Sequence, residues 1–599
     1  MHQGNDDFLF DSFPPVTDQE WKDKILKDLK GKSWDKLKWS PEKNLEFEPY
    51  YRASDLNRSE MGVDSLPGEF PYRRGTHFAT ENDGWQIIQS IHPQHENWKE
   101  RMQSAQNQEV FAFQFEADQE VEELEPFFEQ IDFDQTALHV RFPNVPALLS
   151  LDLYTVLNQK GHSPKVLTGT LLNDPISAAA ANGEVPELAD FAQIEGGVLN
   201  FKQSPWFRGI GLDFTYIQKD GGGVIPQIAY ALGTLVEYLD WHERTQSQIS
   251  LKDLLKNVAV TLPVSTNFFL EIAKFRAFRL LYAKVLQAYG LEDEQTSAPF
   301  LIAETSTFDF SFYDAYNNLL RSTTAAMSAV FGGVQGIVIK PFDHSQEELA
   351  ARLGRNIQHL LRHESYLDKV IDPAGGAYYI EELTNQVAHQ AWDAFQQIEK
   401  RGGFVEMLKS GEIQQQMEEF VATYEHRTST QKDILVGINK YPNTEEIINE
   451  TLPHYDGRGG QFEALRTRVH QMPKRPKAFL LLFGNTAMRN ARAQFSRNAL
   501  GSAGIDIIEN SYLDDPMASL QEAKESGAEI LVFCSSNADY AAQIDSLLEK
   551  SKELAYQPMF IQAGQTEGWR EQGINAVLYA GMDLAGFLNE LVGLLEKQV

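Results

Sequence analysis

The sequence predicts an α/β protein in which a (β/α)8 barrel is followed by a flavodoxin-like, or Rossmann-like, domain and preceded by an extended arm. Between residues 67 and 430, short apolar strands alternate with amphipathic helices, as in a barrel with insertions. Residues 476–599 contain five more strands that alternate with helices. Residues 1–66 have too little apolar periodicity to form a core. For residues 67–430, an open doubly wound sheet is the alternative to a barrel.

Composition limits the class of protein before any motif is considered. The 599 residues are 42% hydrophobic and 23% charged, as in ordinary globular proteins. The formal net charge of −32 disfavours nucleic acid and membrane surfaces as partners. Cys534 is the single cysteine, so an internal disulfide and a metal site built from several cysteines are excluded. We expect a cytoplasmic protein, because no signal peptide or apolar run of ~18 residues is evident.

The N-terminal arm, residues 1–66, carries one clear helix start. Thr17 and Glu20 form a capping-box pattern, and Trp21, Ile25 and Leu29 follow at helical spacing. The rest of the arm is polar and extended. It is therefore expected to lie on the rest of the protein or on a partner.

The barrel region, residues 67–430, contains several apolar strand patterns and two strong helix patterns. The helices are expected over residues 224–238 and 268–289, with Gly290 as a stop signal. Strands are expected over residues 137–142, 166–171, 212–217 and 300–304 and within residues 330–339.

A linker, residues 431–475, is rich in charge and turn residues and ends at the Pro473–Pro476 stretch. In the final domain the expected strands are residues 477–483, 505–508, 529–534, 557–561 and 576–579. A ligand crevice would lie beyond the carboxyl ends of these strands. Neither GxGxxG nor GxxxxGK[ST] occurs, so neither a dinucleotide nor a nucleoside triphosphate is indicated.

Two glycine-containing loops could contribute to a site in the barrel. Residues 221–223 are consecutive glycines before a helix start, where a phosphate or carboxylate could bind, although an ordinary tight turn explains them equally. Residues 169–175 end a strand with Asn173 and Asp174, which could face a barrel active site or simply form a turn.

Two further candidates are best explained without chemistry. His359 and His363 have the i, i+4 spacing of zinc ligands, but residue 360 is Leu and no third ligand is evident, so we expect no metal. Ser535 and Ser536 follow the third strand of the last domain and are expected to line its crevice, without a base that would make either a nucleophile.

Several separated motifs resemble the methylmalonyl-CoA mutase family. The strongest are residues 314–322 running into 329–333, residues 372–379 and residues 267–276. Residues 70–75 and the 169–174 loop also match, in the order of the family. The resemblance implies a radical isomerase in which adenosylcobalamin lies between barrel and C-terminal domain while acyl-CoA threads the barrel axis.

The chain departs from this family where cobalt would bind. The cobalamin domain of the family carries D-x-H-x-x-G, whose His ligates the metal. With Gly504 as the reference, Ala487 stands for the Asp, Arg489 for the His and Arg492 for the Gly. A guanidinium stays protonated and cannot donate a lone pair to cobalt, and no one-residue shift restores the motif.

The barrel departs from the family in the same way. Ser90 stands where catalytic chains have a Tyr beside the reacting carbons. Tyr216 replaces a His that contacts the thioester, and Leu172 replaces a Gln. We therefore expect no catalytic residue in this chain and treat these three positions as vestigial.

The resemblance is closest to the smaller, cofactor-free chain of heterodimeric mutases, and it extends over essentially the whole sequence. It implies a structural subunit whose large catalytic partner binds adenosylcobalamin, with the arm, including Phe8, Phe10, Phe13 and Trp21, embracing that partner. The alternatives are an independently active acyl-CoA mutase with an altered cofactor mode and a free-standing acyl-CoA-binding or regulatory protein.

Overall fold

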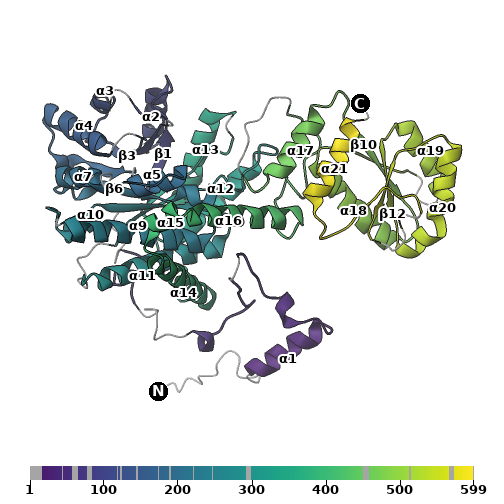
Figure 1. The fold of residues 1–599 in the computed structure, drawn as a ribbon, viewed down its shortest axis with the longest axis horizontal. Coiled ribbons are helices and arrows are strands. Elements are labelled where there is room, and N and C mark those ends of the chain that lie inside the picture. Colours follow the sequence, from purple (N-terminus) through teal and green to yellow (C-terminus); the bar gives the residue numbers. More distant parts are fainter. Residues whose placement is uncertain are drawn as a thin grey trace, which may run out of the picture.

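The computed structural model describes residues 16–42, 45–56, 65–76, 84–117, 119–121, 124–143, 146–172, 174–187, 191–219, 222–245, 247–291, 298–343, 345–448, 457–511, 515–565, 569 and 572–597. Two α/β units make up most of the chain, and Figure 1 shows the larger at the left and the smaller at the right. The helix of the N-terminal arm lies apart from both units (Figure 1).

The larger unit is built on parallel strands in the order β5-β4-β3-β2-β1-β9-β8-β7-β6. Neighbouring strands are parallel throughout. The strands are β1 (Gln86–Ile91), β2 (Ala112–Glu116), β3 (Ala137–Arg141), β4 (Thr168–Leu171), β5 (Trp206–Arg208), β6 (Ile210–Asp213), β7 (Val258–Val264), β8 (Phe300–Thr305) and β9 (Gly336–Val338).

This sheet closes into a barrel because its two end strands are parts of one stretch of chain. Only Gly209 separates β5, which pairs with β4, from β6, which pairs with β7. The nine strand segments therefore occupy eight positions around the barrel. The predicted (β/α)8 barrel is confirmed, and the alternative of an open doubly wound sheet is not. Gly211 permits the closure, because a Cβ there would overlap the Leu171 carbonyl oxygen.

Helices surround this barrel and bury its outer face. All seven residues of β7 are buried, as expected for a parallel strand covered on both faces. The covering helices include α2 (Trp98–Gln106), α3 (Leu124–Glu129), α4 (Pro146–Gln159), α5 (Pro175–Asn182), α7 (Gln193–Phe201), α9 (Val224–Thr245), α10 (Leu251–Lys256), α11 (Phe268–Ala288), α12 (Asn317–Phe331), α13 (Glu347–His359), α14 (Tyr378–Lys400), α15 (Phe404–Lys409) and α16 (Glu412–Ser429).

The strand expected over residues 212–217 is wrong in its second half. β6 ends at Asp213, and Thr215–Lys219 form the short helix α8. The Asp213 carboxylate accepts hydrogen bonds from the Thr215 backbone N–H (3.0 Å) and hydroxyl (2.8 Å), which turns the chain out of the strand. The glycine loop before α9 therefore follows a helix rather than a strand.

The smaller unit has a five-stranded parallel sheet in the order β11-β10-β12-β13-β14. This 2-1-3-4-5 order is the flavodoxin-like arrangement, as predicted. Its strands are β10 (Lys477–Leu482), β11 (Asp506–Glu509), β12 (Ile530–Cys534), β13 (Met559–Ala563) and β14 (Ala576–Leu578). Its helices are α18 (Thr486–Ser502), α19 (Pro516–Ser526), α20 (Asn537–Glu553) and α21 (Leu584–Glu596).

The stretch expected as a linker, residues 431–475, contains more structure than a linker. It includes α17 (Gly460–His470), and its buried Phe462, Leu465 and Val469 join the apolar core on one face of the smaller sheet. The Glu463 carboxylate also accepts from the Phe312 backbone N–H of the barrel at 2.7 Å. This stretch therefore packs with the smaller unit and fastens it to the barrel.

The arm divides into an exposed helix and a segment bound to the barrel. Helix α1 (Asp18–Asp28) begins with the predicted Thr17–Glu20 capping box, and none of its residues is buried. Leu45, Phe47 and Tyr51, by contrast, belong to the barrel's apolar core. Phe8, Phe10 and Phe13 lie outside the described residues.

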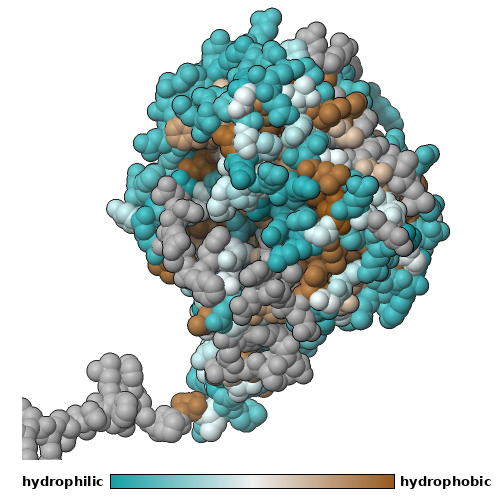
Figure 2. Space-filling model, turned by 90° about the vertical axis from the view of Figure 1, so that its left-hand side faces the viewer, coloured by the Kyte–Doolittle hydropathy of each residue, from teal (hydrophilic) through white to brown (hydrophobic). Residues whose placement is uncertain are grey.

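The side of the molecule that carries the barrel is mostly hydrophilic, with separate smaller hydrophobic areas (Figure 2). Among the described residues, no helix combines the length and the apolar character that crossing a membrane requires.

Candidate functional site

The lower part of the barrel interior is filled by apolar side chains. Leu172, one of the three vestigial positions, is 2% exposed and packs there with Ile88, Ala112, Ile302 and Val338. Its Cδ2 atom would be 2.7 Å from a Cβ at Gly211. Leu172, a position expected to be vestigial, is therefore part of the barrel core.

Above this layer, the carboxyl ends of five strands bring charged side chains together across the barrel axis. Arg141 contacts Glu304 at 2.8 Å and Asp213 at 2.7 Å. Lys340 contacts Glu116 at 2.9 Å and Glu304 at 3.2 Å. None of these five side chains is more than 21% exposed. We call these five residues the barrel-mouth ion network.

Ser90 and Gln114 complete the network. The Ser90 hydroxyl donates to Glu116 at 2.7 Å. Gln114, fully buried, donates to Glu116 at 2.7 Å and to Glu304 at 2.9 Å. Ser90, one of the positions expected to be vestigial, thus binds an internal carboxylate.

The electrostatics of the barrel interior follow from burial and from these ion pairs. Burial by itself would raise the pKa of Glu116, but the charges of Lys340 and Arg141 outweigh it and hold this pKa below its ordinary value. His139, buried one layer away, has its pKa lowered to about 3 by burial, and its ring contacts Thr170 (3.1 Å) and Gln86 (3.2 Å). The Glu116 carboxylate is therefore ionised and the His139 imidazole neutral near pH 7.

Tyr216, the third vestigial position, lies on α8 rather than on a strand. It is partly buried against the barrel core, with its ring 6.4 Å from that of Phe214. The structure thus places Ser90 at the barrel mouth, Leu172 within the barrel and Tyr216 on the helix beyond β6.

The glycine loop before α9 receives a carboxylate from the chain itself. The Val224 backbone N–H donates to both Glu42 oxygens, at 2.9 and 3.1 Å. A Cβ at Gly223 would overlap this carboxylate. Loss of solvent raises the pKa of Glu42 to about 7. The predicted anion position is thus occupied by the arm; Gly221 lies outside the described residues.

In the other predicted loop, residues 169–175, Asp174 caps α5, and Asn173 is outside the described residues.

In the smaller unit, Arg492 fills the crevice beyond the strand ends. Its guanidinium donates to the Ser535 carbonyl oxygen and to the Asn537 side chain (2.5 Å), and lies 5.0 Å from the centre of the Tyr540 ring. A Cβ at Gly564 would lie 2.5 Å from this guanidinium. The side chain therefore closes the gap between β10, β12 and β13.

The other crevice positions are occupied by local contacts. Ala487 is exposed, and Arg489 donates to the Gly484 carbonyl oxygen at 3.4 Å. Ser535 is fully buried and donates to the Phe483 carbonyl oxygen at 2.6 Å. Ser536 caps α20 in a reciprocal capping box with Asp539. Both serine hydroxyls thus serve the fold, and the S-x-x-D pattern could have revealed the cap.

Residues that could hold a metal are not gathered anywhere in the described ranges. His359 ends α13, and a π-helical turn (Leu360–Glu364) carries His363, with the two rings stacked 5.8 Å apart.

The sequence reasoning missed the barrel-mouth ion network, although a signal was present. Glu116, Arg141 and Glu304 stand at or near the carboxyl ends of otherwise apolar strand patterns. Charges at such positions of a barrel face its mouth. The contact of Glu42 with α9 had no comparable signal.

Comparison with known proteins identifies the family. The family model described as methylmalonyl-CoA mutase matches residues 116–477. The chain is 30% identical to the methylmalonyl-CoA mutase small subunit of Porphyromonas gingivalis over 586 residues, 93% of each chain. It is 27% identical to the small subunit of Streptomyces virginiae, covering 96% of each. For the small subunit of Propionibacterium freudenreichii subsp. shermanii the identity is 26%, over 98% of this chain and 96% of the relative. With a family model over more than half its length and relatives over nearly all of it, the chain belongs to the methylmalonyl-CoA mutase family.

Proposed function

We propose that this chain is the small, structural subunit of an adenosylcobalamin-dependent methylmalonyl-CoA mutase. A larger partner chain binds the cofactor and interconverts methylmalonyl-CoA and succinyl-CoA, and the two chains form a heterodimer in the cytoplasm. The observation that carries the proposal is that side chains of this chain fill both the crevice of the smaller unit and the mouth of the barrel. The names of the relatives, which include "small subunit", support it.

The crevice residues do not fit a cobalamin. The family's metal ligand is an imidazole, and the corresponding Arg489 offers only N–H donors. Arg492 occupies the space beside Gly564 that a flat cofactor would need. We therefore assign no cofactor and no catalytic residue to this chain.

The barrel mouth does not favour an acyl-CoA either. A thioester passing along the axis would have to separate Arg141 and Lys340 from Glu304 and Glu116. Separating one charged side chain from its partners in such a partly buried network costs about 3 kcal/mol or more of free energy. Leu172 and its apolar neighbours close the axis below.

The test is co-expression with a large mutase chain from the same organism, followed by gel filtration and visible spectroscopy of the separated chains. We expect a one-to-one complex with one cobalamin, all of it on the larger chain. Stoichiometric corrinoid uptake by the isolated small chain, with rearrangement of a thioester, would instead establish an independent mutase. Acyl-CoA binding without any partner would establish a free-standing binding protein.

A further inference from the structure

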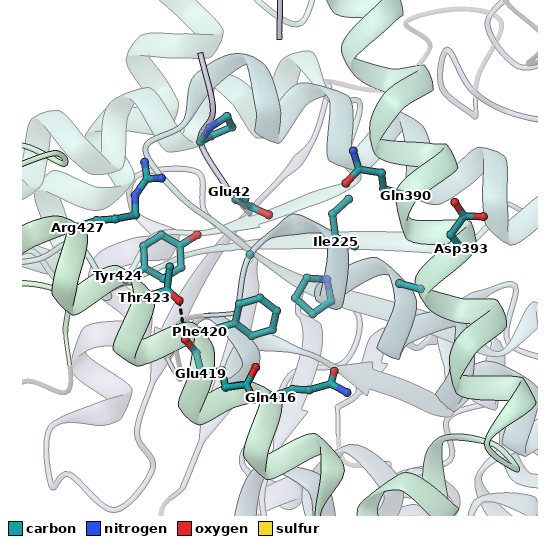
Figure 3. A pocket seen from close by; sticks show the side chains of 14 residues that line it. Glu42, Ile225, Gln390, Asp393, Gln416, Glu419, Phe420, Thr423, Tyr424 and Arg427 are labelled. Atoms are coloured by element: carbon teal, nitrogen blue, oxygen red, sulfur yellow. Dashed lines mark hydrogen bonds between the residues drawn. The ribbon is translucent and has the colours of Figure 1, made fainter. Parts of the chain in front are cut away.

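A cavity of about 450 Å³ lies where the arm crosses the outside of the barrel. Its walls come from residues 41–42 of the arm, the start of α9, and the helices α14 and α16. In Figure 3, Phe420 and Tyr424 of α16 lie on one side of this space, and Gln390 and Asp393 of α14 on the other. The cavity lies outside the barrel axis and apart from the crevice of the smaller unit.

The floor of the cavity is apolar and aromatic. Ile225, near the first turn of α9, projects between the two helices (Figure 3), and Pro226 and Ala394 extend this surface. Phe420 and Tyr424 are both partly buried and present their rings to the same space. Such a floor binds an apolar stem, and aromatic faces attract a cation.

The charged groups around the cavity are predominantly acidic. Asp393 and Glu419 line it, are exposed, and take part in no ion pair among the described residues. The buried Glu42 carboxylate is already held by the Val224 N–H, and burial raises its pKa to about 7, so it carries only part of a negative charge near pH 7. Among the described residues that line the cavity, Arg427 is the one basic side chain, and Asp433 engages its guanidinium through two bonds of 2.7 and 2.8 Å. An incoming cation therefore meets the exposed carboxylates of Asp393 and Glu419, the second of which also accepts a hydrogen bond from the Gln415 side chain at 3.2 Å.

Carboxylates at the rim of an aromatic floor match a lysine or arginine side chain. Its methylene stem would pack on Phe420 and Ile225, while its charged end would reach Asp393 or Glu419. Pockets of this kind accept the anchor residues that dominate interface energies. A second copy of this chain is a poor source, because each copy carries a net charge of −32.

We propose that this cavity, on the α14–α16 face, receives a lysine or arginine side chain from a basic segment of the large mutase chain. The inference rests on the proposed function and adds to it the position and chemistry of one contact between the two chains. The arm lies along the same face, since the Gln386 side chain on α14 donates to the Tyr51 hydroxyl at 3.4 Å. The cavity therefore adjoins the part of the arm that is anchored on the barrel.

The test measures the affinity of three variants for the large chain by titration calorimetry at two salt concentrations. The charge-reversal variant is Asp393→Lys with Glu419→Lys, and the neutral variant is Asp393→Asn with Glu419→Gln. The matched control is Asp545→Lys with Glu549→Lys, which reverses two exposed carboxylates on α20. Thermal melting of each free chain verifies that it is folded.

We expect the charge reversal to raise Kd about 100-fold and the neutral variant about 10-fold, with a weaker salt dependence for both. The control should change Kd less than about twofold.

If the parent chain binds the large chain and the charge reversal binds it equally tightly, the inference is wrong while the proposed function stands. Loss of binding in the α20 control to the same extent would also overturn it, and failure of the parent chain to bind would overturn both. Binding of a small amine such as benzamidine to the cavity in the assembled complex would show that the partner leaves it open and would likewise overturn the inference.

Discussion

Arg492 is the side chain that occupies the crevice beyond the strand ends of the smaller unit. The strands of a flavodoxin-like sheet leave a gap at their carboxyl ends. Here the guanidinium satisfies the Ser535 carbonyl oxygen and rests on Tyr540. The guanidinium thus provides donors for polar groups that lie in the crevice.

Replacing Arg492 with Ala should lower the stability of the smaller unit by about 1–2 kcal/mol, because two hydrogen bonds and the contact with the Tyr540 ring are lost. Hydrogen exchange of peptides from β12 and α20 measures this loss directly. Arg497→Ala is the control, since Arg497 forms only an exposed ion pair with Glu509 and should change stability little. Unchanged exchange in Arg492→Ala would show that solvent replaces the guanidinium without cost.

At the scale of elements, the barrel is held by strands whose interior positions form separate layers. An apolar layer contains Leu172, and a polar layer contains His139 and Gln114. The charged layer lies at the mouth. Because the two polar layers are buried, their protonation is tied to the folding of the barrel.

Acidification should destabilise the barrel through His139. Its folded pKa of about 3 lies below the ordinary value near 6.5, so the unfolded chain binds a proton that the folded chain excludes. The stabilisation is complete above pH 6.5 and is lost as the pH falls from 6.5 towards 3. By pH 5 this loss is about 2 kcal/mol.

The measurement compares urea unfolding of parent and His139→Gln at pH 7.5 and pH 5.0. The variant should be less stable at pH 7.5 but should lose about 2 kcal/mol less than the parent on acidification. His426→Gln, at an exposed position on α16, serves as the control and should behave like the parent. Equal pH dependence in all three chains would contradict the assignment. The ion network contributes at lower pH, where Glu116, whose folded pKa is depressed, finally takes up a proton.

At the scale of the whole molecule, the arm has two parts with different partners. Leu45 and Phe47 are fully buried in the barrel core, so this part is a permanent piece of the chain's own fold. Helix α1 is held by local contacts, with the Trp21 ring 4.9 Å from Tyr50 and 6.1 Å from Trp34. A helix this short is marginal by itself in water, which favours a role at an interface.

Removal of residues 1–32 should therefore leave the melting temperature of the isolated chain unchanged and weaken its complex with the large chain. Removal of residues 1–52 should also lower the melting temperature, because it uncovers the surface under Leu45, Phe47 and Tyr51. Differential scanning calorimetry and gel filtration of the mixed chains measure the two effects. If the variant without residues 1–32 binds the large chain as tightly as the full chain does, α1 does not take part in the interface.

Much of the architecture could be predicted from local pattern. The spacing of apolar residues indicated the β/α alternation of both units, and the Thr17–Glu20 pair located the start of α1. The predicted end of the strand at residue 217 is wrong, because residues 212–217 have the apolar pattern of a single strand. In the structure the Asp213 side chain turns the backbone into α8. Residues 431–475 have the charge and turn pattern of a linker. Their buried residues pack in a core formed mostly by later segments, and local pattern does not indicate such packing.

The sequence by itself determined the family and the kinds of element, because both depend on residue identity and short-range spacing. Only the tertiary structure decided that β5 and β6 close the barrel, that Arg492 fills the crevice, that Glu42 caps α9 and that Arg141 and Lys340 meet acidic partners across the axis. These contacts join residues far apart in the chain. Their existence depends on which elements pack together, and local sequence carries little information about that choice.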